Sequence, residues 1–353
     1  MTTRTDSANR TIVFLTAQVL FTFALAFVFL PSAWAGENIS MLLAKAEAGD
    51  AAAQSSLGAL YYNGQGVPQD FAKAAHWLRL AAHQGYAPAQ FNLGILYDNG
   101  QGIPQDFAKA AYWFRLASKK RYAPAQFNLG DLYYNGLGVL QDYLKAAYWF
   151  HLAARQGFAS AQNNLGDLYY NGQGVLQDFA KAAHWLSLSA HQGYAPAQFN
   201  LGQLYSVGQG VPQDYGKAAH WVHLAAKQGE ADAQIILGNF YAIGLGVPQN
   251  NAKAAYWSRL AAENHHHWIR LAAKQGNAAA QYNLGDLYAT GQGVPQDYVK
   301  AAYWYRLAAK RGNAAAQYNL GDLYVIGLGV PQDKAKAAYW YQLAAKNKHH
   351  VFH

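Results

Sequence analysis

The chain has 353 residues and a net charge of +8; 52% of its residues are hydrophobic and 15% aromatic, whereas only 13% are charged. So many aromatic residues, with a charged share of about half the usual value, exclude a disordered chain. The absence of cysteine excludes a disulfide-stapled scaffold, a thiolate zinc site, an iron–sulfur cluster and a cysteine nucleophile.

The first segment, residues 1–35, has the pattern of an export signal. A basic start with Arg4 is followed by an uncharged apolar stretch over residues 11–30, and the small residues Ala33 and Ala35 come next. This order is typical of a signal peptide, so we expect cleavage after Ala35 and a periplasmic or secreted mature protein. The apolar stretch is about as long as the ~20 residues that span a bilayer, so an uncleaved membrane anchor is the alternative.

The rest of the chain repeats one unit. Its glutamines recur 36 residues apart, and its tryptophans keep the same register, until one insertion shifts both. A fixed period of this size predicts a solenoid and not two or three separate domains. The marker glutamines are Gln54, Gln90, Gln126, Gln162, Gln198, Gln234, Gln281 and Gln317. We expect eight units over residues 51–346, a capping half-repeat over 36–50 and a tail over 347–353.

The residue pattern of each unit predicts a helix, a loop and a second helix. In the second unit, Leu93 and Leu96 lie on one face of a helix that ends near Asn99. Gly100 is suited to the left-handed backbone of a helix C-terminus. Asp106 is a good N-cap for the second helix, because its carboxylate can accept from the first free backbone amides.

The repeated pattern, A-x-A-Q-x-N-L-G-x-L-Y-x-x-G-x-G-V-P-Q-D-x-x-K-A-A-x-W-x-x-x-A-A-x-Q-G, closely resembles the Sel-one-like repeat (SLR) family, a relative of the tetratricopeptide repeat. Residues 123–158 carry it almost whole. The resemblance implies an all-α fold, a right-handed superhelical solenoid of eight ~36-residue repeats whose first helices line the concave face. It also implies an adaptor or scaffold, of a kind that bacteria often export to the envelope.

Polar residues recur on the first helices, away from the Leu/Tyr face. An Asn follows six of the marker glutamines by two residues. An Asp often follows three residues later on the same helical face, and an aromatic residue often precedes the Asn. These candidate groove residues are Phe91, Asn92, Phe127, Asn128, Asp131, Asn164, Asp167, Phe199, Asn200, Tyr282, Asn283, Asp286, Tyr318, Asn319 and Asp322.

By resemblance to tetratricopeptide arrays, this is where an extended peptide docks. Clamps for a C-terminal carboxylate use Lys or Arg here, whereas this face offers Asp. We therefore expect a partner that presents amides, hydroxyls or basic groups. The alternative is that the Asn and Asp side chains bond between adjacent repeats and bind nothing.

The other repeated polar residues favour structural roles. The Gly-x-Gly pairs predict turns and not phosphate cradles, because no Lys-Ser/Thr follows them. The Asp residues that precede the second helices define the repeat, whereas a catalytic constellation should break it. A lysine recurs once per second helix, which predicts a solvated face. We expect no catalytic residue, metal site or cofactor, and the export signal disfavours nucleic acid as a partner.

An insertion near residues 258–268 lengthens the sixth spacing from 36 to 47 residues. It duplicates a segment, so that Trp257 to Ala262 recurs as Trp268 to Ala273. Eleven residues make nearly three helical turns, so one continuous helix is one solution. The other is a break at Asn264 with the following histidines in a loop, and we expect the break.

These features predict a non-catalytic scaffold or adaptor of the bacterial envelope that binds a protein or peptide in its concave groove, with a cell-wall component as a second candidate ligand. The alternatives are a secreted effector that contacts host proteins and an enzyme that acts on the cell wall or on β-lactams. Contact with a membrane is expected only through an uncleaved N-terminal segment.

Overall fold

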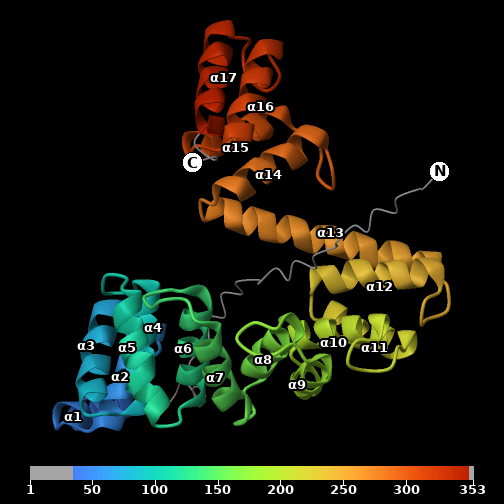
Figure 1. Ribbon diagram of the computed structural model, residues 1–353. Helices are drawn as coiled ribbons and strands as arrows, with labels where there is room; N and C mark the ends of the chain where they lie inside the picture. The colour runs from blue at the N-terminus through green and yellow to red at the C-terminus, as the bar shows by residue number, and fades with distance from the viewer. Residues whose placement is uncertain (1–34, 350–353) are drawn as a thin grey trace. The chain divides into compact units, whose positions relative to one another are not determined.

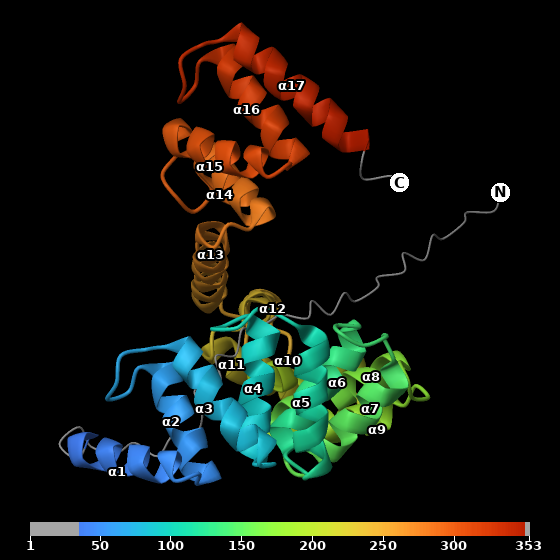
Figure 2. The ribbon, with the colours of Figure 1, turned by 90° about the vertical axis from the view of Figure 1, so that its left-hand side faces the viewer.

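The computed structural model describes residues 35–349, and this range contains 17 α-helices and no strand. The expected signal segment up to residue 34 lies outside the described residues. The chain forms two compact units, Met1–Ala117 and Ser118–His353, which are described separately. In each unit, consecutive helices pack against one another (Figures 1 and 2), which confirms the predicted all-α solenoid of helix pairs. The right-handed sense of the superhelix stays a prediction.

Eight helix pairs follow a single helix, α1 (Ala35–Glu47). The first helices of the pairs are α2 (Ala51–Asn63), α4 (Ala87–Asn99), α6 (Ala123–Asn135), α8 (Ala159–Asn171), α10 (Ala195–Val207), α12 (Ala231–Ile243), α14 (Ala278–Thr290) and α16 (Ala314–Ile326). The second helices are α3 (Phe71–His83), α5 (Phe107–Lys119), α7 (Tyr143–Ala154), α9 (Phe179–His191), α11 (Tyr215–Lys227), α13 (Asn251–Lys274), α15 (Tyr298–Lys310) and α17 (Lys334–His349).

The loop inside each repeat is shaped by its two glycines, as the fourth repeat shows. Gly172 ends α8 in the left-handed conformation at φ +68°, and its N–H donates to the carbonyl of Leu168. Gly174 also has a positive φ, and a Cβ there would lie 2.2 Å from the backbone of Tyr143 in the preceding repeat. The second glycine therefore lets the loop lie directly on the start of α7.

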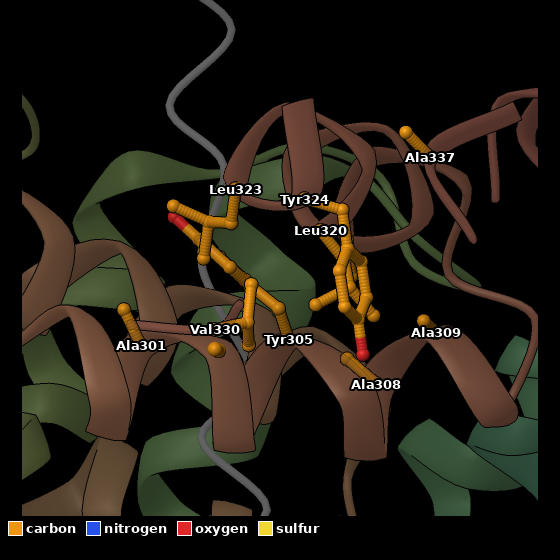
Figure 3. Packing of buried hydrophobic residues seen from close by; sticks show 11 residues of the cluster. Ala301, Tyr305, Ala308, Ala309, Leu320, Leu323, Tyr324, Val330 and Ala337 are labelled. Atoms are coloured by element: carbon orange, nitrogen blue, oxygen red, sulfur yellow. The ribbon is translucent and has the colours of Figure 1, made fainter. Parts of the chain in front are cut away.

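Small and large side chains alternate in the core. In the last repeats, Ala308 and Ala309 of α15 are buried with Leu320 and Tyr324 of α16. Figure 3 shows the rings of Tyr305 and Tyr324 lying among these residues. The alanines let the helices approach closely, and the rings fill the remaining space.

A ladder of buried amides joins successive helices. In α8, Gln162 Nε2 donates to the carbonyl of Ala154 at 3.1 Å, near the C-terminal end of α7, and Gln162 Oε1 accepts from Gln192 Nε2 at 2.7 Å. The marker glutamine is at most 4% exposed in every repeat. The carbonyl of Ala154 also accepts from the backbone N–H of Gly157 at 3.0 Å, so the glutamine supplies a second hydrogen bond and ties α8 to the end of α7.

The insertion is helical, so the expected break at Asn264 is wrong. One continuous helix, α13, spans Asn251–Lys274 (Figures 1 and 2). Asn264 Nδ2 donates to Gln234 Oε1 at 3.0 Å, and this bond continues the amide ladder from within the helix. The insertion of nearly three turns keeps both copies of the duplicated segment on the same face, so the helix has no need to break.

The two copies of the duplicated segment divide the packing between them. Trp257 of the first copy is buried, whereas Trp268 of the second is 58% exposed. In the second copy, Ile269 and Ala273 are buried in a cluster with α14 residues such as Leu284. The first copy packs with its own first helix, and the second receives the next repeat.

Both ends of the array are helical. Ala46 of α1 is buried against Ala53 and Leu57 of α2, in the place expected for the capping half-repeat. At the other end, α17 continues to His349, so residues 347–349 of the expected tail are helical.

Candidate functional site

The two candidate residues in the first unit lie in its interior. Phe91 is 5% and Asn92 8% exposed. The ring of Phe91 packs against Phe114 of α5 with a centroid distance of 5.7 Å. Neither side chain therefore offers a partner much surface.

In the second unit, the aromatic candidates pack mainly against the second helix of their own repeat. The ring centroid of Phe127 lies 5.7 Å from that of Phe150, and Tyr282 lies 5.9 Å from Tyr305. Phe199 is half-buried beside a core cluster. Tyr318 is the exception, because 51% of it is exposed although it lies 5.3 Å from the ring of Tyr341.

A polar network joins α8 to α10. Asn200 Nδ2 lies 3.2 Å from Asn163 Oδ1 and 3.2 Å from Asp167 Oδ1, and donates to both. Asn163 Nδ2 donates to Asp167 Oδ2 at 3.1 Å. At this point the structure shows the alternative interpretation, in which Asn and Asp bond between adjacent repeats. Asn164 is half-buried beside the network, and its Oδ1 accepts from Asn163.

The carboxyl groups of Asp131 and Asp167 are desolvated. Burial raises the pKa of Asp167 from 3.8 to about 7, against the opposing effect of the hydrogen bond from Asn163. Burial likewise raises the pKa of Asp131. Removing a carboxylate from water disfavours its charged form. The side-chain hydrogen bonds that oppose this effect come from neutral amides, of Asn163 at Asp167 and of Asn135 at Asp131.

The carboxylates of the last two repeats accept from tyrosines of the second helices. Tyr341 donates to Asp322 Oδ1 at 2.6 Å, and this bond raises the pKa of the tyrosine to about 12. Tyr305 donates to Asp286 Oδ1 at 3.4 Å and accepts from Asn319 at 3.3 Å. Asn283 is exposed, and Asn128 beside Asp131 is half-buried. Polar side chains are thus at least partly exposed on the first helices near both ends of the second unit.

The aspartates that cap the second helices have a backbone donor and a lysine beside their carboxylates. The carboxylate of Asp178 accepts from the backbone N–H of Lys181 at 2.9 Å, and this bond, together with the lysine's charge, lowers its pKa. Lys181 Nζ lies 3.2 Å from the same carboxylate and 5.4 Å from the ring centre of Tyr169. Comparable Lys–Asp pairs at 3.0–3.7 Å recur in seven repeats.

The sequence did not predict the role of Asn163 or the amide ladder. Asn163 stands where other repeats carry an aromatic residue, and that irregularity was the signal available. The marker glutamines defined the period, but their bonds run to residues 8 before and 30 after them, which a pattern within one repeat does not show.

Residues 35–349 contain no group of three or more His, Asp or Glu side chains placed to hold a metal ion. In the same range, no helix combines the length and the apolar character that a membrane span needs.

Helix pairs of similar length except at α13, joined by two-glycine turns and stacked through buried amides, define an α-solenoid of the helix–turn–helix repeat class. The Sel1 repeat model matches residues 51–86, 87–122, 123–158, 159–194, 195–230, 231–266, 266–277, 278–313 and 314–349. The chain belongs to the Sel1 repeat family. The short match at 266–277 covers the whole of the second copy in α13. Sel1 repeat proteins generally act as protein–protein interaction scaffolds and are typically non-catalytic.

Two solved structures are similar over most of the chain. One is a protective antigen of uropathogenic Escherichia coli with an SLR fold, at 34% identity and a TM-score of 0.62, covering 88% of this chain and 79% of that one. The other is a Sel1 repeat protein from Oxalobacter formigenes, at 35% identity and a TM-score of 0.51, covering 88% of both chains. A comparison with curated proteins finds no match.

Proposed function

We propose that this protein is a non-catalytic interaction scaffold of the bacterial envelope. Its partner is a protein or peptide that docks on the first helices of the second unit and offers amide, hydroxyl or basic groups. Membership of the Sel1 repeat family supports the scaffold role. The partial exposure of Asn128, Asp131 and Asp322 and the exposure of Asn283 support the choice of surface.

One observation carries the choice of partner chemistry. Within the described residues, no ion pair involves Asp131, Asp286 or Asp322, whereas the capping aspartates of seven second helices pair with lysine. A carboxylate that is partly desolvated and lacks a cation is stabilised by a basic or hydrogen-bond-donating partner. The first helices therefore favour a donor-rich ligand.

Two sets of substitutions test the surface. The first set, Asp131→Asn with Asp286→Asn and Asp322→Asn, removes three negative charges from first helices. The matched set, Asp142→Asn with Asp178→Asn and Asp297→Asn, removes the same charge from second helices. Because a charge-assisted hydrogen bond is worth about 1.5–3 kcal/mol, we expect the first set to reduce capture of partners by about tenfold or more. Equal capture by the two sets, measured by quantitative pull-down from envelope extracts, would rule out this surface.

The location in the envelope rests on the N-terminal pattern of a basic start, an apolar stretch and Ala33 and Ala35. Cell fractionation tests it. We expect a periplasmic protein that is shortened by residues 1–35, and mass spectrometry of the purified chain gives the length directly. Recovery from the culture medium would instead favour the secreted effector, and recovery of the full-length chain with membranes would favour the anchor.

A further inference from the structure

A cavity of about 340 Å³ opens where α13, α14 and α15 meet. Figure 1 shows these three helices following one another in the second unit. The polar lining of the cavity includes Lys274 and Gln275 at the end of α13, Gln281 of α14, and Arg311 just after α15. Trp304 and Leu307 contribute apolar surface. No acidic residue lines it.

Gln281 belongs to this lining, and the oxygen of its buried amide is unpaired. Gln281 is only 3% exposed, and its Nε2 donates to the carbonyl of Ala273 at 3.0 Å. That bond fixes which end of the amide is the oxygen. Within residues 35–349, Gln281 Oε1 has no hydrogen-bond partner. A buried acceptor without a partner carries a desolvation cost of about 1–3 kcal/mol, so it favours any ligand that brings a donor.

The sequence explains why the oxygen is unpaired. In the amide ladder, the oxygen accepts from an amide 30 residues later, as Gln317 does from Asn347 at 3.0 Å. Thirty residues after Gln281 stands Arg311. Its guanidinium lies instead over Gly276, where a Cβ would be 2.9 Å from Nη2. Gln90 is a second buried glutamine with an unpaired oxygen, and its corresponding position also carries a cation, Lys120.

The cavity also carries positive charges that are not paired with a carboxylate. Among the described residues, no ion pair joins Lys274 or Arg311 to a carboxylate, whereas seven lysines of the second helices pair with the aspartate that caps their own helix. A ligand that matches both the two cations and the buried acceptor has two different groups, an anion and a hydrogen-bond donor.

We propose that this cavity binds a small carboxylate that carries an N–H or O–H group on the carbon bearing the carboxylate, such as an N-acylated amino acid or a 2-hydroxy acid. The carboxylate lies between Arg311 and Lys274, and the planar guanidinium suits its two oxygens. The adjacent donor bonds to Gln281 Oε1, and the ligand's apolar group packs on Trp304 and Leu307. The cavity volume, at the low end of the about 300–1,000 Å³ of ligand pockets, limits the ligand to this size.

The ligand chemistry is tested by titrating the full chain in ligand-observed NMR. N-acetylalanine carries both groups, its methyl ester lacks the charge, and its N-methyl derivative lacks the donor. We expect each loss to weaken binding by about tenfold. Lactate is the O–H arm, and whichever of lactate and N-acetylalanine binds more tightly identifies the source of the donor. If propionate, which has no donor, binds as tightly as both, the proposal fails.

Protein variants separate binding from folding. Arg311→Gln restores the amide ladder, so we expect it to pair with Gln281, to raise or preserve the melting temperature and yet to lose N-acetylalanine binding by about tenfold or more. Lys310→Gln removes the same charge from the neighbouring residue, which does not line the cavity, and should bind as the unmodified chain does. Unchanged binding by Arg311→Gln, or equal loss in both variants, would overturn the proposal.

Discussion

The aspartates of the first helices and those that begin the second helices differ in what surrounds their carboxylates. Asp178 accepts from a backbone N–H and lies beside Lys181, so its pKa is lowered. Asp167, in the first helix of the same repeat, is surrounded by the amides of Asn163 and Asn200, and burial raises its pKa to about 7. When charged, Asp178 favours the folded state, whereas Asp167 opposes it.

This difference separates structure from function within one repeat. A capping aspartate is fully explained by the helix that it begins. The desolvated carboxyl of Asp167 opposes folding at neutral pH, so the fold alone does not explain why α8 carries it. A partner that binds the first helices would explain it.

The largest expected effect belongs to the buried amides, which both kinds of helix share. Gln162→Ala removes the hydrogen bonds of Gln162 with the carbonyl of Ala154 and with the amide of Gln192, and it leaves a cavity in the interior. We expect the free energy of unfolding to fall by about 2–4 kcal/mol in urea denaturation. The control is Gln177→Ala, because Gln177 is exposed and bonds only to the carbonyl of Tyr170. It should change stability by no more than about 0.5 kcal/mol, and an equal loss would contradict the ladder's role.

Asp167→Asn should give a smaller effect with a distinct pH dependence. The unfolded pKa is about 3.9, whereas the folded value is about 7, so the native chain retains a proton that the unfolded chain has lost between these values. Stability therefore falls as pH rises from about 4 to about 7. We expect the variant to lose this fall and to be more stable by about 2 kcal/mol at pH ~8. Urea midpoints at pH ~5 and ~8 measure it, and parallel pH profiles would refute it.

The smallest effect, of opposite sign, is expected at the caps. Asp178 has a lowered pKa, so its contribution is present above the unfolded value of about 3.9 and is lost as pH falls through the folded one. Asp178→Ala should lower the melting temperature at pH ~7, and the deficit should vanish in strong acid. Lys181→Met removes only an exposed ion pair and should change the melting temperature less. A larger effect of Lys181→Met would show that the pair, and not the cap, stabilises the helix.

The elements that the sequence predicted depend on neighbours along the chain. Asp178 is recognisable as a cap because the glycines and the following helix lie within a few residues of it. The role of Asn163 depends on α10, and the free oxygen of Gln281 depends on residue 311, so neither appears in a pattern of one repeat. The insertion was mispredicted for a similar reason: the histidines suggested a loop, but the packing of Ile269 and Ala273 on α14 favours a helix.

The long helix α13 also changes how the repeats support one another. Ala255, Ser258 and Ala262 are exposed there, although the corresponding Ala219, Val222 and Ala226 are buried one repeat earlier. In a linear array, cooperativity comes from the apolar area that each repeat buries against its neighbour. At α13 that area is supplied by the second copy, in which Ile269 and Ala273 are buried with residues of α14. The last two repeats are therefore coupled to the rest of the unit through the end of α13, about 16 Å farther along the helix than in a repeat without the insertion.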